Sequence, residues 1–353
     1  MDLSSETVFE LRTDPTTGRK VLIAEGRALR PNDFIGDAAK PISHHTSDCP
    51  FCVGNERATP HELAVVNDAA GKWQVRVVPN KYPAVALASG GRESPAGDAF
   101  PTAGDLRPPL APAYGVHEVI IESPRHITDW SELSTAELAT VLTVFRDRIK
   151  HSVDEHQMTS ALIFKNVGQA AGASLEHVHS QLVALPFVPP ELALELIYSS
   201  GFFKEHRECL LCRLMADETK DGKRLVIEND HFAAICAYAG RQPYETWILP
   251  KSHAASFTSL SGEESHFLAA ILIELVRRLG AVLSPLAYNL VLHTAPLGQK
   301  NVGHFHWHWE LIPRSTSLAG FEWGTGMYIN SVSPERAAIR LRTSKSGEKL
   351  PIQ

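Results

Sequence analysis

The sequence predicts an α+β protein made of two similar halves, in which antiparallel sheets carry flanking helices. Two observations predict this class. An internal repeat pairs residues 119–186 with residues 246–313 without a gap, so that His126 falls on His253. Within each copy, strand patterns alternate with one long amphipathic pattern of helical period. A duplicated segment with one set of patterns indicates that both copies fold alike.

Each copy contains, in order, the patterns of a strand, a helix, a second strand and a strand that carries histidines. Apolar runs rich in β-branched residues predict the strands, and Ser-x-x-Glu predicts a capping box at the start of each helix. The expected ranges are strands 117–122 and 245–249, helices 134–151 and 261–282, and strands 160–166 and 288–293. Because side chains at alternate strand positions share a face, His177, His179 and Gln181 should point in one direction.

A length of 353 residues predicts two domains, which we expect at residues 1–195 and 196–353. Residues 86–115, rich in Gly, Pro and Ala, are expected to form a long surface loop. The formal charge of −6 disfavours nucleic acid as a partner, since nonspecific nucleic-acid binding relies on a basic surface. No apolar run reaches the roughly 18 residues that span a bilayer, and no secretory signal is present, so we expect a cytoplasmic protein that binds no membrane.

Four of the five cysteines form two Cys-x-x-Cys pairs, which in a reducing cytoplasm are more often metal ligands or redox dithiols than disulfides. Each pair has two histidines at equal spacing in its copy, which predicts two tetrahedral, structural zinc sites per chain. A redox role is disfavoured because neither pair opens a helix after a strand–helix unit. The predicted ligands are Cys49, Cys52, His126 and His177 in the first copy and Cys209, Cys212, His253 and His304 in the second, with His306 as the alternative to His304.

A loop of small residues, 171–174, precedes the histidine pair of the first copy. Such a loop lets backbone N–H groups approach a phosphate closely, and the Ser174 hydroxyl adds a donor. A neutral imidazole can attack phosphorus, and if zinc holds His177, then His179 is free for that attack. Gln181, two residues further on, can donate to a phosphoryl oxygen and stabilise the charge that develops there.

These motifs resemble the active-site segment of the galactose-1-phosphate uridylyltransferase branch of the histidine-triad superfamily. The segment reads Asn-x-Gly, Ala-Gly-x-Ser and His-x-His-x-Gln, with Val where the usual family triplet has Pro, and CPFC, PNKYP and SPRH resemble further family motifs. The resemblance covers nearly the whole chain. It implies two histidine-triad-like lobes and a homodimer that acts on a nucleotide sugar and a sugar 1-phosphate or phosphate.

The same resemblance implies roles for individual residues. His179 would be the nucleophile that becomes nucleotidylated, and Gln181 would support the phosphoryl group. The residues implied to bind substrate are Asn80, Asn166, Gly172 and Ser174 for the nucleotide, Arg27 and Arg30 for the phosphates, and Glu322 for the sugar hydroxyls. The second copy has His308 where an ungapped register places the glutamine, so we expect it to have lost catalysis and kept the scaffold.

The C-terminal half leaves the substrate open. In many uridylyltransferases a Lys precedes a Gly-Tyr-Glu segment that holds the hexose phosphate, whereas here that position is Thr316 and residues 320–330 resemble plant-type ADP-glucose phosphorylases. Three hypotheses remain: a UDP-glucose:hexose-1-phosphate (galactose-1-phosphate) uridylyltransferase, which is our expectation; a phosphorylase of ADP-glucose or a dinucleoside polyphosphate; and a zinc-stabilised nucleotide-binding module without turnover. The presence of both His179 and Gln181 disfavours the third.

Overall fold

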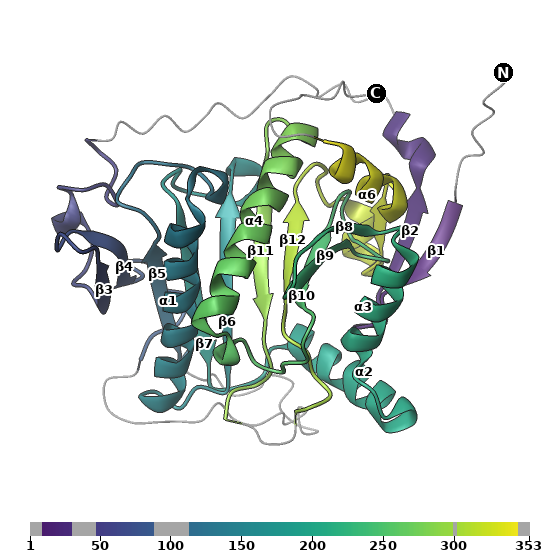
Figure 1. Cartoon of the computed structure of the whole chain (residues 1–353), viewed down its shortest axis with the longest axis horizontal. Helices are drawn as coiled ribbons and strands as arrows, with labels where there is room; N and C mark the ends of the chain where they lie inside the picture. Colours follow the sequence, from purple (N-terminus) through teal and green to yellow (C-terminus); the bar gives the residue numbers. More distant parts are fainter. Residues whose placement is uncertain (1–8, 30–46, 88–112, 299–301, 345–353) are drawn as a thin grey trace, which may run out of the picture.

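Figure 1 shows the computed structural model of the chain, which describes residues 9–29, 47–87, 113–298 and 302–344. Within these ranges the strands form one large and one small sheet, and long helices cover the large sheet. This arrangement of antiparallel sheet and flanking helices confirms the predicted α+β class. Most of the predicted surface loop, residues 88–112, lies outside the described residues.

Ten strands form the large sheet, and their order is symmetric: β3-β4-β5-β7-β6 is followed by β11-β12-β10-β9-β8. Every neighbouring pair in it is antiparallel. The two halves therefore have the same topology, as a duplication predicts. The strands are β3 (Ala64–Asn67), β4 (Trp73–Pro79), β5 (Val116–Ile121), β6 (Ser160–Val167), β7 (His179–Leu185), β8 (Leu225–Glu228), β9 (Phe232–Cys236), β10 (Thr246–Pro250), β11 (Tyr288–His293) and β12 (His308–Pro313).

Strands β6 and β11 join the two halves edge to edge. Val167 pairs with Tyr288, and Asn166 pairs with Asn289, so the sheet continues from one half into the other. The Asn289 Nδ2 also donates to the Asn166 Oδ1 at 2.8 Å. The two lobes are thus joined along β6 and β11. Each strand provides hydrogen-bond partners for backbone groups of the other that would otherwise be unpaired at an exposed sheet edge.

Helices α1 (Thr135–Asp154) and α4 (Gly262–Val282) lie side by side across one face of the large sheet (Figure 1). Both begin at the predicted capping boxes, in which a serine hydroxyl and a glutamate carboxylate each accept from the other residue's N–H. An N-cap of this kind stabilises a helix by about 0.5–2 kcal/mol. None of the helices in the described residues has the length and apolar character that crossing a membrane requires.

One apolar core lies between these helices and the sheet and runs through both halves. Trp130 from the first half and Trp309 from the second are both fully buried, and their rings meet edge to face at 6.3 Å. Side chains alternate along β5, so Ile120 enters this core while Val119 and Ile121 face the opposite side, beside Cys49. The face of the sheet opposite α1 and α4 therefore carries the candidate site.

A small sheet and the remaining helices complete the fold. Strand β13 runs parallel to β2 and antiparallel β1 lies on the other side of β2. The expected division between residues 195 and 196 falls inside α2 rather than in a linker. The elements are β1 (Phe9–Thr13), β2 (Lys20–Ala24), β13 (Tyr328–Asn330), α2 (Pro190–His206), α3 (Leu210–Asp221), α5 (Gly320–Thr325) and α6 (Pro334–Thr343).

Candidate active site and metal clusters

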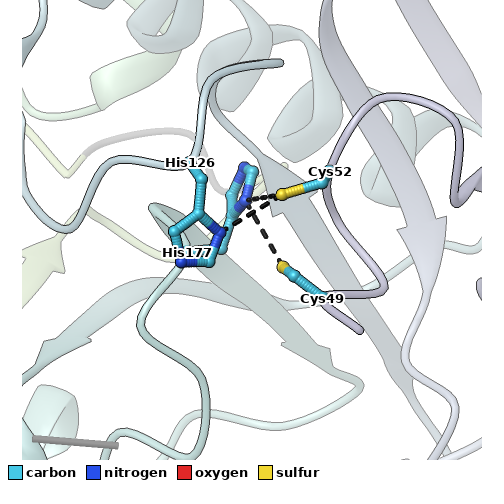
Figure 2. Close-up of side chains that lie close together, drawn as sticks. All are labelled: Cys49, Cys52, His126 and His177. Atoms are coloured by element: carbon cyan, nitrogen blue, oxygen red, sulfur yellow. Dashed lines mark hydrogen bonds between the residues drawn. The ribbon is translucent and has the colours of Figure 1, made fainter. Parts of the chain in front are cut away.

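The first Cys–His cluster brings together the four residues predicted for it (Figure 2). The Sγ atoms of Cys49 and Cys52 lie 3.5 Å and 3.6 Å from the His177 Nδ1, and the Cys52 Sγ lies 3.2 Å from the His126 Nδ1. All four ligand atoms are within 4.8 Å of one another. Two thiol sulfurs and two imidazole nitrogens at this separation fit a tetrahedral zinc ion.

A hydrogen bond on the far side of His177 decides which nitrogen faces the cluster. The His177 Nε2 lies 2.8 Å from the Ser123 carbonyl oxygen, which can only accept, so Nε2 carries the proton and Nδ1 has a free lone pair. Burial lowers the pKa of His177 to about 4, so the ring is neutral near pH 7. A neutral imidazole oriented by a carbonyl is the usual form of a zinc-binding histidine.

The second cluster contains Cys209, Cys212 and His253 as predicted, but its fourth member is His306 rather than His304. The Cys212 Sγ lies 3.2 Å from the His306 Nδ1 and 3.3 Å from the His253 Nδ1. Cys209 caps the N-terminus of α3, which follows helix α2 and not a strand. The predicted ligand His304 was therefore wrong, and the alternative, His306, takes its place in the cluster.

The physical reason is a loop that is two residues longer in the second half. Strand β6 matches β11 at an offset of 127 residues, yet Phe164 pairs with Gln181 while its counterpart Val291 pairs with Glu310. Strands β7 and β12 therefore match at an offset of 129, and the ungapped register was wrong there. The corresponding pairs are His177 with His306, His179 with His308, and Gln181 with Glu310, so His308 does not hold the glutamine position.

His179 is the first residue of β7 and is half-buried. Its Nδ1 lies 2.6 Å from the His177 carbonyl oxygen, so Nδ1 carries the proton and Nε2 keeps its lone pair. Burial, together with the nearby Lys165 charge, lowers the pKa of His179 to about 4, which keeps the ring neutral near pH 7. No hydrogen bond among the described residues uses Nε2, so that atom is available as a nucleophile.

The first cluster also supports His179 by packing. Phe51 lies between the two cysteines in the sequence, and its ring meets His179 edge-on at 5.2 Å and His177 at 5.9 Å. The His177 residue thus offers its ring to the cluster and its carbonyl to His179. A metal ion there would hold His177 and Phe51, and through them His179, in place, which is a role that the cysteine and histidine spacing alone did not reveal.

A buried ion pair supports β7 from the other face of the sheet. The Lys165 Nζ donates to Glu122 at 2.6 Å and to the His179 carbonyl oxygen at 2.8 Å. The second carboxylate oxygen of Glu122 accepts from the Ser180 hydroxyl at 2.5 Å, and Trp130 donates to the first at 2.8 Å. The side chains of Lys165 and Glu122 are 1% and 0% exposed, so this pair is fully desolvated.

Gln181 lies on the same face of β7 as His179 and contacts two polar side chains. Its Oε1 is 2.9 Å from the His117 Nε2 and 3.2 Å from the Asn80 Nδ2. The structure thus brings together Asn80 and Gln181, both implied by the resemblance. It adds His117 from β5, which belongs to none of the motifs.

The loop between β6 and β7 adopts backbone conformations that favour glycine. Gly168 has φ +78°, and a Cβ there would lie 2.9 Å from the Ala287 Cβ, so both conformation and space exclude a larger residue. The Gly172 N–H donates to the Gln169 carbonyl oxygen at 2.9 Å and is not available to a phosphate. Ser174 is exposed, and no hydrogen bond in the described ranges engages its hydroxyl, so it is the loop member best placed for a ligand.

The second half anchors this loop of the first half. The Asn289 Nδ2 donates to the Ala171 carbonyl oxygen at 2.9 Å as well as to Asn166. The Asn166 Oδ1 is therefore occupied by this contact. A residue of the second lobe thus fixes the candidate phosphate loop of the first.

Three of the residues implied to bind substrate are not placed beside His179. Arg30 lies outside the described residues, and Arg27 is exposed on a short helix, Glu25–Leu29. Glu322 lies on α5, which packs on β13 of the small sheet, and its carboxylate accepts from the Ala319 N–H at 2.9 Å. The roles of these three residues stay predictions.

In the second half, buried polar side chains occupy the corresponding positions. His308 and Glu310 occupy the places of His179 and Gln181, and both are buried. Glu310 pairs with Arg241 and with His293, whose ring stacks on His308 at 4.7 Å. This half presents no accessible imidazole at its equivalent site, in keeping with the expected loss of catalysis.

His293 sits between two carboxylates. Its Nδ1 is 2.7 Å from Glu195, and its Nε2 is 3.4 Å from Glu310. Burial would lower the pKa of His293, but the two carboxylates outweigh it and raise that pKa well above its ordinary value. Glu195, His293 and His308 also offer three ligand atoms within 4.8 Å. A metal ion there and a proton on His293 are alternatives, because a ligating imidazole must be neutral.

Two histidine-containing lobes fused in one sheet, with Cys–His clusters and an available histidine beside a glutamine, define a nucleotidyltransferase of the two-lobed histidine-triad type. The family model described as galactose-1-phosphate uridyl transferase, N-terminal domain, matches residues 2–189, and the corresponding C-terminal domain matches residues 196–349. The chain therefore belongs to the galactose-1-phosphate uridyl transferase family, as the motifs indicated.

Relatives cover nearly the whole chain. An ADP-glucose phosphorylase of Arabidopsis thaliana is 34% identical over 94% of this chain and 92% of its own length. A galactose-1-phosphate uridylyltransferase of Thermotoga maritima is 27% identical over 96% of this chain and 99% of its own length. The crystal structure of an ADP-glucose phosphorylase from Arabidopsis thaliana with bound ADP-glucose superposes with a TM-score of 0.80, at 32% identity, over 96% of this chain and 100% of that one.

Proposed function

We propose that the chain transfers the adenylyl group of ADP-glucose to inorganic phosphate through a covalent intermediate on His179. In the first step the Nε2 lone pair attacks the α-phosphorus, the bond from that phosphorus to the bridging oxygen breaks, and glucose 1-phosphate leaves. In the second step phosphate attacks the same phosphorus, the phosphorus–nitrogen bond breaks, and ADP leaves. Two displacements replace one difficult displacement.

The observation that carries the covalent mechanism is the hydrogen bond from the His179 Nδ1 to the His177 carbonyl oxygen, at 2.6 Å. It directs the lone pair to Nε2 and stabilises the positive charge that the ring acquires when Nε2 bonds to phosphorus. Ser174 and Gln181 supply donors for the phosphoryl oxygens on the same side of the sheet. The proposed roles of Asn80 and Asn166 follow the family resemblance.

The choice of acceptor rests on Thr316, where the resemblance places a phosphate-binding lysine. Its hydroxyl donates to the Gln242 Oε1 at 2.6 Å, so this position offers a sugar phosphate neither a charge nor a free hydroxyl hydrogen. A charge-assisted contact contributes about 1.5–3 kcal/mol, so its loss weakens sugar-phosphate binding roughly tenfold to hundredfold. The identity to a relative named ADP-glucose phosphorylase supports the adenosine donor.

A second candidate is the UDP-glucose:hexose-1-phosphate uridylyltransferase that the sequence led us to expect. Arg314 favours this second candidate. Its backbone N–H donates to the Ala287 carbonyl oxygen, and its guanidinium forms no ion pair within the part of the chain that the structure describes. A guanidinium two residues from Thr316 could replace the missing lysine for a hexose 1-phosphate.

We further propose that each Cys–His cluster holds one structural zinc ion, that the chain forms a homodimer, and that it acts in the cytoplasm. The ligand sets support zinc, because thiolate and imidazole together select it over harder cations. When bound, zinc would fix ligand geometry and contribute folding free energy. The dimer and the location rest on the family resemblance and on the sequence.

The test identifies the nucleotide-sugar donor and the phosphate acceptor in two separate steps. The chain is incubated with ADP-glucose or UDP-glucose, each labelled in the α-phosphate, and the labelled protein is then given phosphate or galactose 1-phosphate. We expect label from ADP-glucose and discharge by phosphate. In the matched variant Thr316→Lys, galactose 1-phosphate should become an effective acceptor. Label from UDP-glucose with discharge by galactose 1-phosphate alone would establish the second candidate, and no label from either donor would leave a binding module.

A further inference from the structure

We propose that His117 is a positioning residue, which fixes the Gln181 side-chain amide with its Nε2 toward the phosphoryl group transferred to His179. The inference deepens the proposed function and rests on it, because it concerns the same step. An amide can lie in either of two orientations, and only one presents a donor to a phosphoryl oxygen. The structure contains the contacts that select between them.

The backbone N–H of Ala84 sets the protonation of the His117 ring. That N–H donates to the His117 Nδ1 at 3.0 Å, so Nδ1 has to be the nitrogen without a proton. The ring proton is then on Nε2, which lies 2.9 Å from the Gln181 Oε1. A backbone group thus determines that His117 donates toward Gln181.

Asn80 supplies a second donor to the same oxygen. The Asn80 Oδ1 accepts from the Tyr82 N–H at 2.8 Å, which leaves the Asn80 Nδ2 as the end that faces Gln181, at 3.2 Å from Oε1. The donor nitrogens of Asn80 and His117 lie 3.0 Å apart because both converge on one atom. Only an oxygen can receive both donors, so a flipped Gln181 amide would place its own N–H groups against them.

The pairing of β5 with β7 places His117 and Gln181 next to each other. Val183 on β7 lies opposite His117 on β5, so Gln181, two residues away, is the diagonal neighbour on the same face. In the second half, Arg241 bridges Glu245, the residue before β10, and Glu310 on β12. The first half instead joins β5 to β7 through the contact of His117 with Gln181.

The orientation has a consequence for the reaction. No hydrogen bond among the described residues uses the Gln181 Nε2, so it is the free end of the amide, two residues from the nucleophile on one strand face. A donor fixed before the reaction stabilises developing phosphoryl charge without reorganisation, and losing such a donor costs about 100- to 1,000-fold in rate. Losing only His117 leaves Asn80 to favour the same orientation, so we expect a smaller loss of about tenfold, the effect of one hydrogen bond.

The kinetic test is the rate at which His179 acquires a nucleotide in a single turnover with ADP-glucose. His117→Leu should lower this rate about tenfold while the dissociation constant for ADP-glucose changes less than twofold, and His117→Gln, whose amide can donate in place of Nε2, should recover most of the rate. In a Gln181→Ala background, His117→Leu should change the rate less than twofold. An undiminished effect in that background would overturn the proposal.

A second measurement does not depend on activity. A long-range proton–nitrogen spectrum of the wild-type chain, in which the His117 signals are identified by their loss in His117→Gln, should show the form protonated at Nε2. The form protonated at Nδ1 would overturn the proposal. If the wild-type chain acquires no nucleotide from either sugar donor, the proposed function fails, and this spectrum still decides how His117 meets Gln181.

Discussion

Lys165 donates a hydrogen bond from its Nζ to the backbone carbonyl oxygen of His179, 2.8 Å away, from the side of the sheet that faces the helices. The side chain of His179 is held on the other side by the carbonyl of His177 and by Phe51. His179 is therefore supported from both faces of the sheet. One support is a buried ion pair, and the other is the first Cys–His cluster.

Removing the Lys165 charge should destabilise the chain strongly. Lys165→Met leaves the buried carboxylate of Glu122 without its cation, and breaking a buried pair in this way costs about 3–5 kcal/mol of unfolding free energy. Chemical denaturation measures the change. The double variant Glu122→Leu with Lys165→Met removes both charges and should recover most of the loss. Equal stability of the single and double variants would contradict this account of the pair.

Metal content should distinguish His306 from His304. For the two proposed zinc sites, His306→Ala should lose one ion by elemental analysis and should melt at a lower temperature, because binding energy at a structural site is folding energy. His304→Ala is the matched control, two residues away, and should retain both ions. Loss of an ion in His304→Ala with retention in His306→Ala would restore the original prediction from the repeat.

The pH dependence of stability should reveal the charge on His293. Its pKa is raised in the folded chain, so its contribution to stability is complete below the ordinary pKa, about 6.5, and is lost as pH rises through the folded pKa. The unfolding free energy lost in His293→Gln should therefore be largest near pH 6 and should shrink at alkaline pH. The groups that face His293 are Glu195, Glu310, His308 and, through Glu310, Arg241. A loss that does not change with pH would show that His293 is neutral.

Much of the fold could be predicted because it depends on local patterns. The capping boxes at Ser134 and Ser261 lie where their sequence motifs place them, since a cap involves only four consecutive residues. Strand β11 has the predicted bounds, 288–293. The pairing of β6 with β11 could not be predicted from the sequence, because no pattern within either strand indicates which strand will lie beside it.

The candidate site could likewise be predicted only in part. Spacing within the repeat identified the first cluster from the sequence, because cysteine and histidine are typical zinc ligands. Its members are Cys49, Cys52, His126 and His177. The same spacing chose His304 wrongly, since a change in loop length does not alter the residue types on either side of it. His117, Lys165 and Glu122 had no motif, and their positions depend on contacts between strands that are distant in the sequence.

The central claim is that His179 becomes covalently nucleotidylated, and intact-protein mass spectrometry tests it most directly. The chain is incubated with ADP-glucose and, separately, with UDP-glucose, without acceptor, and peptide mapping locates any added mass. We predict one adenosine monophosphate per chain, attached to His179, and no adduct in His179→Asn, which should keep the wild-type metal content and melting temperature. An adduct that persists in His179→Asn, or one that maps to another residue, would contradict the mechanism.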